Sequence, residues 1–216
     1  MEVSDEIKRV FDLEIDTLVK VRKQLDGTYS EAAELLLRCT GKVVVTGMGK
    51  SGLIARKIAS TMVSTGTPAI FLHPGDGMHG DVGIVRHDDV VLAISKSGES
   101  EELQNILLYV KKIGAPVVSI TACQDSTLGR SSDLVLFTPV EKEACPLNLA
   151  PTSSTTAALV VGDALAMVLM KMRGFEPENF AQFHPGGQLG KRLLLTVADI
   201  MRSGENNPVV GVNDTV

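Results

Sequence analysis

The spacing of apolar residues predicts two helices at the start of the chain. Apolar side chains recur at helical intervals over Phe11–Leu25, and the pattern stops near Asp26–Gly27. A second helix is predicted to begin after Ser30, with Gly41 as its stop signal. We therefore expect residues 1–40 to form helices that pack on the domain that follows.

From residue 42 the pattern changes to short apolar runs that alternate with helical stretches. The runs are typical of strands buried on both faces and lie at residues 42–46, 69–73, 89–95, 117–121 and 134–138. Helices are predicted at residues 51–63, 99–113 and 155–172. This alternation predicts a five-stranded parallel, doubly wound α/β sheet, a flavodoxin-like α/β/α sandwich, over residues 41–195. Sheets of this kind bind ligands beyond the carboxyl ends of their strands.

The chain after Gly174 differs from this pattern. It reads first as a loop, and residues 196–216 then stop in the middle of a pattern with no helix to complete it. We expect a second domain that is cut off just after it begins.

Composition and charge exclude several classes of function. A formal net charge of −5 and an aromatic content of 4% argue against nucleic-acid binding. The three cysteines contain no CxxC pair, which fits a reducing cytoplasm. The first residues lack a signal-peptide pattern. The most apolar stretch, residues 157–170, is interrupted by Gly162 and Asp163, so we expect a buried helix and no membrane span.

The first loop of interest, residues 47–52, fits GxGxxG directly after a predicted strand. A dinucleotide site needs an acidic residue at the end of the next strand, and residues 53–75 contain no Asp or Glu. The glycine that would open a Walker P-loop is also absent. The remaining interpretation is a tight turn whose N–H groups around Gly49, with Lys50 and Ser51, face an anion.

Two further loops collect hydroxyl residues at predicted helix starts. Ser95, Ser97 and Ser100 surround a glycine after the strand at 89–95, an arrangement that favours a phosphate on a small molecule over a plain Ser cap. The run PTSSTT, which includes Thr155, opens the long apolar helix. It is expected to form a second wall of the same anion site, with a Ser/Thr-rich helix cap as the alternative.

Four sequence-distant groups are candidates for acid–base chemistry: Lys50, Glu102, Glu143 and His184. Aldose–ketose isomerisation needs a carboxylate or His base, a donor that polarises the carbonyl, and exclusion of water. Each group also has an ordinary alternative. Glu102 suits a solvated first helical turn, Glu143 a surface charge, and His184 a packing role in a turn.

The segment FLHPGDGMHGD raises the question of a metal site. His73 and His79, together with Asp76 and Asp81, could bind zinc. The segment offers no Cys ligand and no HxxxH spacing on a helix, so a loop that faces a sugar is the favoured interpretation.

Five segments together resemble the SIS (sugar isomerase) family and, within it, the D-arabinose-5-phosphate isomerases of the KDO pathway. They are GMGKSG at 47–52, HPGDGMHGD at 73–81, SKSGESEE at 95–102, APTSSTTA at 150–157 and FHPGGQLGKRL at 183–193. Single SIS loops also occur in deaminating synthases and in sugar-phosphate-sensing regulators, whereas the second and fifth segments are more specific.

The resemblance implies interconversion of D-arabinose 5-phosphate and D-ribulose 5-phosphate through an enediolate. The family's catalytic set matches the four acid–base candidates named above, and its sugar-contacting positions match Gly66, Thr67, His73 and His79. The resemblance also implies that no cofactor is required and that zinc inhibits through His73.

The resemblance further implies a cytoplasmic homotetramer in which the segment around His184 reaches a neighbouring subunit's site. Members usually carry two C-terminal CBS modules, and residues 196–216 resemble the opening of the first. Two rival functions remain at this point, a sugar-phosphate sensor without turnover and an isomerase for another sugar phosphate. An oxidoreductase is a more distant third.

Overall fold

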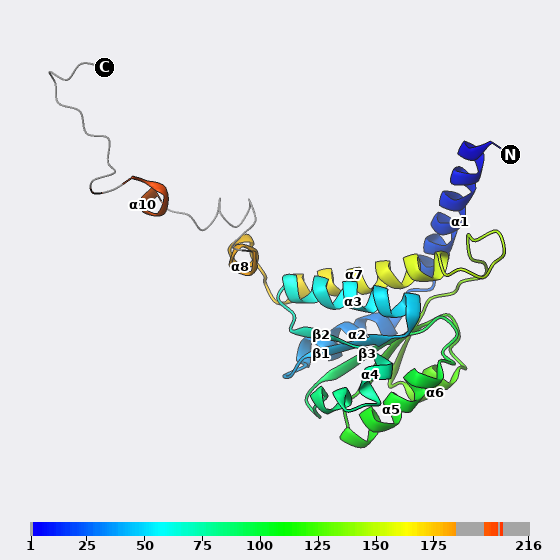
Figure 1. Cartoon of the computed structure of the whole chain (residues 1–216), viewed down its shortest axis with the longest axis horizontal. Helices are drawn as coiled ribbons and strands as arrows, with labels where there is room; N and C mark the ends of the chain where they lie inside the picture. Colours follow the sequence, from blue (N-terminus) through cyan, green and yellow to red (C-terminus); the bar gives the residue numbers. More distant parts are fainter. Residues whose placement is uncertain (1, 185–196, 203, 205–216) are drawn as a thin grey trace, which may run out of the picture. The chain divides into compact units, whose positions relative to one another are not determined.

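Five short apolar strands form one parallel sheet in the computed structural model, which describes residues 2–184, 197–202 and 204 (Figure 1). The strand order is β2-β1-β3-β4-β5. The strands are β1 (Val43–Gly47), β2 (Ala69–Leu72), β3 (Val90–Ile94), β4 (Val117–Thr121) and β5 (Leu134–Phe137). The predicted parallel α/β sheet is confirmed, and the strand bounds agree with the prediction to within a residue.

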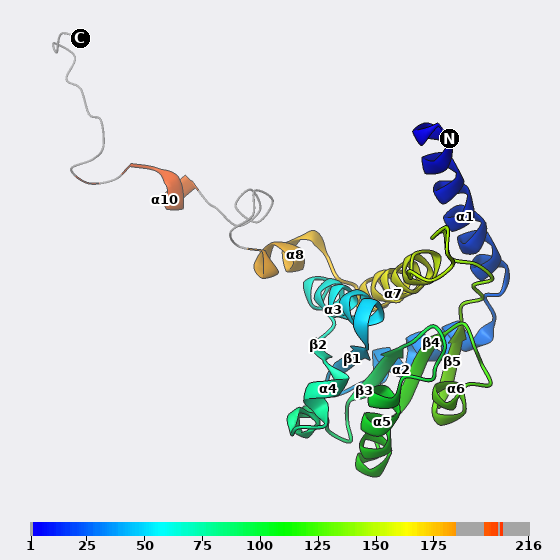
Figure 2. The same cartoon turned by 45° about the vertical axis from the view of Figure 1, so that its right-hand side comes forward.

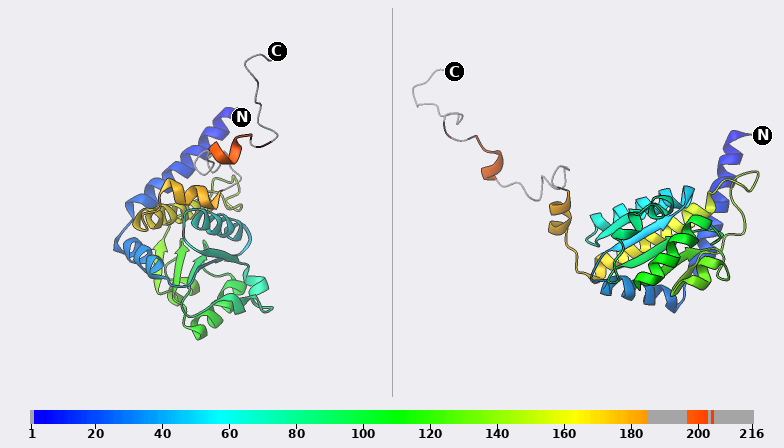
Figure 3. Two further views of the ribbon diagram at one scale, coloured as in Figure 1. Left: turned by 90° about the vertical axis from the view of Figure 1, so that its left-hand side faces the viewer. Right: turned by 60° about the horizontal axis from the view of Figure 1, so that its bottom comes forward.

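Helices cover both faces of the sheet (Figures 2 and 3). One face carries α2 (Gly27–Arg38), α3 (Gly49–Ser64) and α7 (Ser153–Met172), and the other carries α4 (Pro74–Gly77), α5 (Glu101–Ile113) and α6 (Thr127–Ser131), with the 3₁₀ turn η1 (Asp81–Ile84). Alternate strand residues supply the two cores: Val43 and Val45 pack towards α3 and α7, while Val44 packs towards α5.

Helix α7 belongs to the core of the fold. It is the helix of the described chain that is long and apolar enough to cross a membrane, and half of its most apolar window is buried. Its buried side chains, among them Val161 and Leu165, pack with α3, and Gly162 lets Ile58 approach its backbone. The interruption at Gly162 that the sequence displays is therefore a packing contact between two helices.

The two N-terminal helices differ in how they relate to this core. Helix α1 (Val3–Lys23) contacts α7 through its C-terminal half and extends beyond the sheet at its other end (Figure 1). Helix α2 begins at Gly27, so the predicted start after Ser30 is wrong. The Asp26 carboxylate accepts a hydrogen bond from the Thr28 N–H at 3.0 Å, and this N-cap starts the helix earlier.

The chain divides into two compact units, residues 1–175 and 176–216. The second unit contains α8 (Pro177–Phe183) and α10 (Val197–Ile200). The prediction of a loop after Gly174 is wrong for α8, because Pro177 occupies its first turn and Glu176 and Asn179 form a reciprocal capping box. The predicted domain boundary between residues 195 and 196 lies outside the described residues.

Candidate active site

Three helix N-termini lie at the carboxyl edge of the sheet. Helix α3 follows β1 and α5 follows β3, and these neighbouring parallel strands bring both helix starts to one edge. Helix α7 runs beside α3 in the same direction, so its start lies at that end too (Figures 1 and 2). The N-cap residues of all three, Met48, Ser100 and Thr152, make no side-chain capping hydrogen bond. The first N–H groups of a helix have no partner within it, and together with the helix dipole they favour negative charge at these starts.

The turn from β1 into α3 brings the backbone close to any ligand at this edge. Gly49 has φ of 57°, in the left-handed region that favours glycine. A side chain on Gly52 would collide with the Gly47 carbonyl, so only glycine lets α3 start this near the strand. Lys50 is exposed in the first turn, with Ser51 next to it. The structure thus places the predicted anion-facing turn at the end of β1.

The loop from β3 into α5 is built by its own serines. The Gly98 N–H donates to Ser95 Oγ at 3.1 Å, and the Glu99 N–H donates to Ser97 Oγ at 3.3 Å. Ser95 Oγ also lies 3.5 Å from the Ser100 hydroxyl. The loop's serines therefore hold the turn through hydrogen bonds within it, and the Ser100 side chain does not cap the first N–H groups of α5. Capping alone does not explain the serines.

The start of α7 is occupied by Glu143, whose side chain is 1% exposed. Its Oε2 atom accepts hydrogen bonds from the N–H groups of Thr152 at 2.9 Å and Ser154 at 3.1 Å. Its Oε1 atom accepts from Lys96 Nζ at 2.6 Å. Burial alone would raise the pKa of Glu143, but the hydrogen bonds from Lys96, Ser154 and Thr152 outweigh it and lower the pKa to about 2.

The stability of the protein should depend on pH through Glu143. Its folded pKa of about 2 lies below the ordinary 4.5, so its contribution is complete above pH 4.5 and is lost as the pH falls towards 2. The difference in unfolding free energy between wild type and Glu143→Gln should therefore shrink across that range. Urea denaturation at neutral pH and at several acidic values measures the difference. A difference that stays constant with pH would contradict the assignment.

The burial of Glu143 excludes the alternative that it is a surface charge. It also changes the prediction that the PTSSTT segment forms a second wall of the anion site. Helix α7 presents its N–H groups to this carboxylate, so they are not free for a phosphate. The Thr155 hydroxyl is also engaged, since it donates to the Thr152 carbonyl at 2.8 Å. Among the described residues, the helix starts whose first N–H groups are not occupied by a carboxylate are those of α3 and α5.

Glu102 contrasts with Glu143. It lies in the first turn of α5, two residues after Ser100, and its side chain is exposed. Among the described residues its carboxylate has no hydrogen-bond or ion-pair partner. Glu99, by comparison, is held by the Thr127 N–H at 2.8 Å and by Gln104. Glu102 is therefore a carboxylate that is free to meet a ligand at the α5 start.

The positions implied for sugar contact fall at two ends of the sheet. His73 follows β2 at the carboxyl edge, and its Nδ1 accepts from the Gly75 N–H at 3.2 Å, while His79 is exposed. Gly66 and Thr67 lie between α3 and β2, at the opposite, amino-terminal edge. Thr67 is 1% exposed, and a side chain on Gly66 would meet Phe175. One chain does not bring this pair to the other predicted residues.

The structure does not join His184 or the histidines considered for a metal to the residues described above. His184 ends α8 in the second unit, stacks on Phe180 at a ring separation of 3.9 Å and has Nδ1 2.9 Å from the Phe180 carbonyl. It is not placed relative to the sheet. Across the described residues, no three His, Cys, Asp or Glu side chains are grouped to hold a metal ion. The His73 ring is 3.9 Å from Asp76, an exposed pair.

Sequence reasoning passed over Lys96. Lys96 lies between the first two serines of SKSGES. Its ammonium group joins the β3–α5 loop to Glu143 across 47 positions of sequence. A lysine inside a Ser/Gly loop at the carboxyl end of a strand is a signal that could have indicated it.

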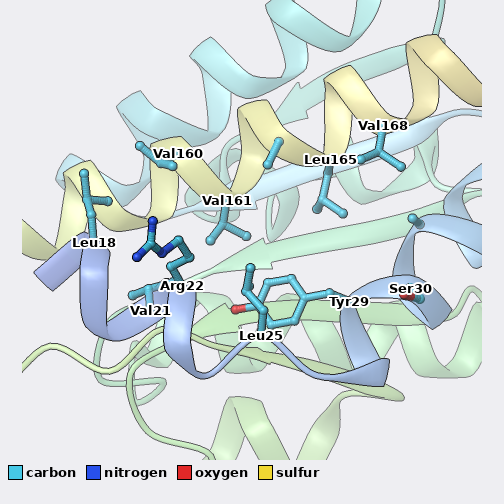
Figure 4. A pocket seen from close by; sticks show the side chains of 12 residues that line it. Leu18, Val21, Arg22, Leu25, Tyr29, Ser30, Val160, Val161, Leu165 and Val168 are labelled. Atoms are coloured by element: carbon cyan, nitrogen blue, oxygen red, sulfur yellow. The ribbon is translucent and has the colours of Figure 1, made fainter.

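An apolar cavity of about 420 Å³ lies away from these loops (Figure 4). It is lined by residues of α1, α2 and α7, with Arg22 and Tyr29 among leucine and valine side chains. None of its lining residues is a predicted site residue. The predicted site residues therefore do not line this cavity.

Comparisons with known proteins identify the family of this chain. The sequence pattern of the SIS domain family matches residues 36–168. Arabinose 5-phosphate isomerase KdsD of Escherichia coli O6:H1 (strain CFT073) is 51% identical over 203 residues, covering 94% of this chain and 62% of that protein. The KdsD protein of Francisella tularensis (strain SCHU S4) is 48% identical, covering 95% and 64%. The chain thus spans less than two thirds of these curated relatives.

A solved structure gives the same fold. The structure of c3406 from E. coli CFT073, in complex with arabinose 5-phosphate, aligns with a TM-score of 0.82 at 41% sequence identity. The alignment covers 86% of this chain and all of that one.

Proposed function

Because this chain belongs to the SIS domain family, we propose that it is an aldose–ketose isomerase that interconverts D-arabinose 5-phosphate and D-ribulose 5-phosphate. The reaction is the first step of KDO synthesis. The observation that carries the proposal is the pair of uncapped helix starts, α3 and α5, at the ends of adjacent strands, with the free carboxylate of Glu102 beside one of them. The relatives support the choice of sugar, since the names of the curated proteins and the ligand of the solved structure both point to arabinose 5-phosphate.

The substrate's phosphate rests on Ser95, Ser97, Ser100 and the first N–H groups of α5, with Ser51 nearby. These donors and the helix dipole balance its charge. Glu102 then carries the proton between C2 and C1 through an enediolate, and Lys50 balances the charge that develops on the oxygens. His184, supplied by a neighbouring subunit, assists ring opening. The reaction needs no cofactor, and zinc at His73 would act as an inhibitor.

A substrate panel tests the proposal. The chain is incubated with five-, six- and seven-carbon sugar phosphates and with unphosphorylated arabinose, and the ketose or aldose formed is measured. We expect turnover of arabinose 5-phosphate and none of free arabinose, because the phosphate supplies the binding energy that holds the sugar. Turnover restricted to a six- or seven-carbon sugar phosphate would show that arabinose 5-phosphate is not the substrate. Saturable binding without any turnover would indicate a sensor.

We also propose a homotetramer in the cytoplasm. Support comes from large apolar side chains that one chain leaves exposed, among them Phe11 (64%) and Ile15 (53%) on α1 and Met167 (46%) on α7. An assembly of copies would cover them. The three free cysteines support a reducing compartment. Light scattering of the purified chain measures its mass, and a monomer would remove the tetramer from the proposal.

A further inference from the structure

The two members of the Lys96–Glu143 ion pair differ in their exposure to solvent. Glu143 is enclosed, at 1% exposure, whereas 40% of the Lys96 side chain is exposed. Their charged atoms are 2.6 Å apart. The carboxylate is therefore beneath the surface, and the ammonium group is the part of the pair that a solute can reach.

Glu143 has little capacity left for a substrate. Its two oxygens already accept from Lys96, from two backbone N–H groups at the start of α7, and from the Thr152 hydroxyl at 3.3 Å. A general base must come within hydrogen-bond distance of the proton that it removes, and it must gain stability when protonated. Protonation of Glu143 would instead break these charge-assisted hydrogen bonds.

The backbone on both sides of the pair is anchored. The Lys96 carbonyl accepts from the Ala122 N–H at 3.1 Å and from the Thr121 hydroxyl at 3.2 Å, which ties the loop to the end of β4. On the other side, the Glu143 N–H donates to Asn148 at 2.7 Å. The ammonium group is consequently held at a defined place between the starts of α5 and α7.

Helix α1 adds a second anchor to the segment that carries Glu143. Arg9, paired with Glu6 at 2.6 Å, donates to the Ala144 carbonyl at 2.7 Å. Lys20 pairs with Glu141 at 2.6 Å. These contacts tie the residues that flank Glu143 to α1.

We propose that Lys96 is the cation that binds the anionic sugar phosphate at this edge, and that Glu143 is a positioning residue that acts through Lys96. This inference rests on the proposed function, because it names a residue of the same site. The substrate's phosphate binds at the α5 start, and the Lys96 ammonium group, which belongs to the same loop, forms an ion pair with it. Glu143 orients that group and exchanges no proton with the sugar.

The test compares Lys96→Met, Lys96→Arg, Glu143→Gln and the double variant Lys96→Met/Glu143→Gln. Loss of a charge-assisted contact should raise KM for arabinose 5-phosphate by about ten- to a hundredfold in Lys96→Met, and by less in Lys96→Arg. Glu143→Gln should raise KM with kcat largely kept, and should add little in the Lys96→Met background, because both changes remove one contact. The acidic limb of the kcat/KM pH profile should persist in Glu143→Gln.

Lys142→Met is the matched control. Lys142 is an exposed lysine next to Glu143, and its loss should leave KM unchanged. Circular dichroism checks that each variant is folded, and titration calorimetry with arabinose 5-phosphate measures binding separately from turnover. Unchanged affinity and KM in folded Lys96→Met would overturn the proposal. A fall in kcat of about 10² or more in Glu143→Gln, multiplied further in the double variant, would also overturn it and make Glu143 a base.

The wild-type measurement separates this inference from the proposed function. Absence of turnover in the wild type would refute the isomerase while leaving the affinity of the Lys96 variants measurable with whichever sugar phosphate binds. Wild-type turnover together with unaltered Lys96→Met would refute the role of Lys96 alone.

Discussion

Substitution of Glu102 by Gln is expected to lower kcat for arabinose 5-phosphate by about 10² to 10⁴. The amide keeps the size and hydrogen-bonding reach of the side chain but cannot accept a proton. Glu102 is exposed in the first turn of α5, and in the described part of the chain no side chain or N–H group engages its carboxylate. The variant should therefore fold as the wild type does. A coupled ketose assay gives kcat, and KM should change little.

Glu101→Gln is the control for this prediction. Glu101 is the preceding residue, is equally exposed and carries the same charge at the same helix start. Its loss should reduce rate only through a small change in the local field. Near-normal kcat in a folded Glu102→Gln protein would exclude Glu102 as the base. Equal losses in both variants would indicate an effect of charge and not of proton transfer.

Asp89→Ala is expected to lower the free energy of unfolding by about 3–5 kcal/mol. Asp89 is 1% exposed and accepts from Lys42 Nζ at 2.7 Å, from the Lys42 N–H at 2.8 Å and from the Arg86 N–H at 2.8 Å. The carboxylate joins the starts of β1 and β3. Its removal leaves the Lys42 and Arg86 N–H groups without this acceptor and removes the charge partner of the Lys42 ammonium group, which keeps the Ile84 carbonyl at 2.8 Å. Urea denaturation at a single protein concentration measures the change.

Asp88→Ala supplies the comparison, because the Asp88 side chain is exposed. Its effect should stay within about 0.5 kcal/mol, as for most surface substitutions. Asp89 lies at the amino-terminal edge of the sheet, away from Glu102 and the serine loop. The folded Asp89→Ala protein should therefore keep its kcat at low temperature. A loss of stability below about 1 kcal/mol would show that this buried pair is not a main support of the sheet.

The strands and long helices were predictable because their signal is local. A strand covered on both faces needs apolar residues at every position, and β1, β3 and β4 meet that need with unbroken runs. The order of these runs along the chain then determines which loops lie at the ligand-binding edge. The turn at 47–52 and the loop at 95–100 were located in this way.

The starts of α2 and α8 were not predicted, although the sequence contains a capping signal at each of them. Asp26 followed by Thr28 is an N-cap, and Glu176-Pro177 opens α8 with a capping box. In each case the apolar periodicity was weak, because the first helix has mixed burial and the second is short. Capping chemistry, and not the apolar pattern, determines where such helices begin.

By itself, the sequence determined the sheet, its layers and the loops at its carboxyl edge, since periodicity and turn chemistry act between near neighbours. Only the tertiary structure decided what each polar side chain in those loops does. It buried Glu143 against Lys96, left Glu102 free, and placed Gly66 and Thr67 at the opposite edge. The physical reason is that burial and hydrogen-bond partners come from segments distant in sequence, and these set the charge state and reach of a carboxylate.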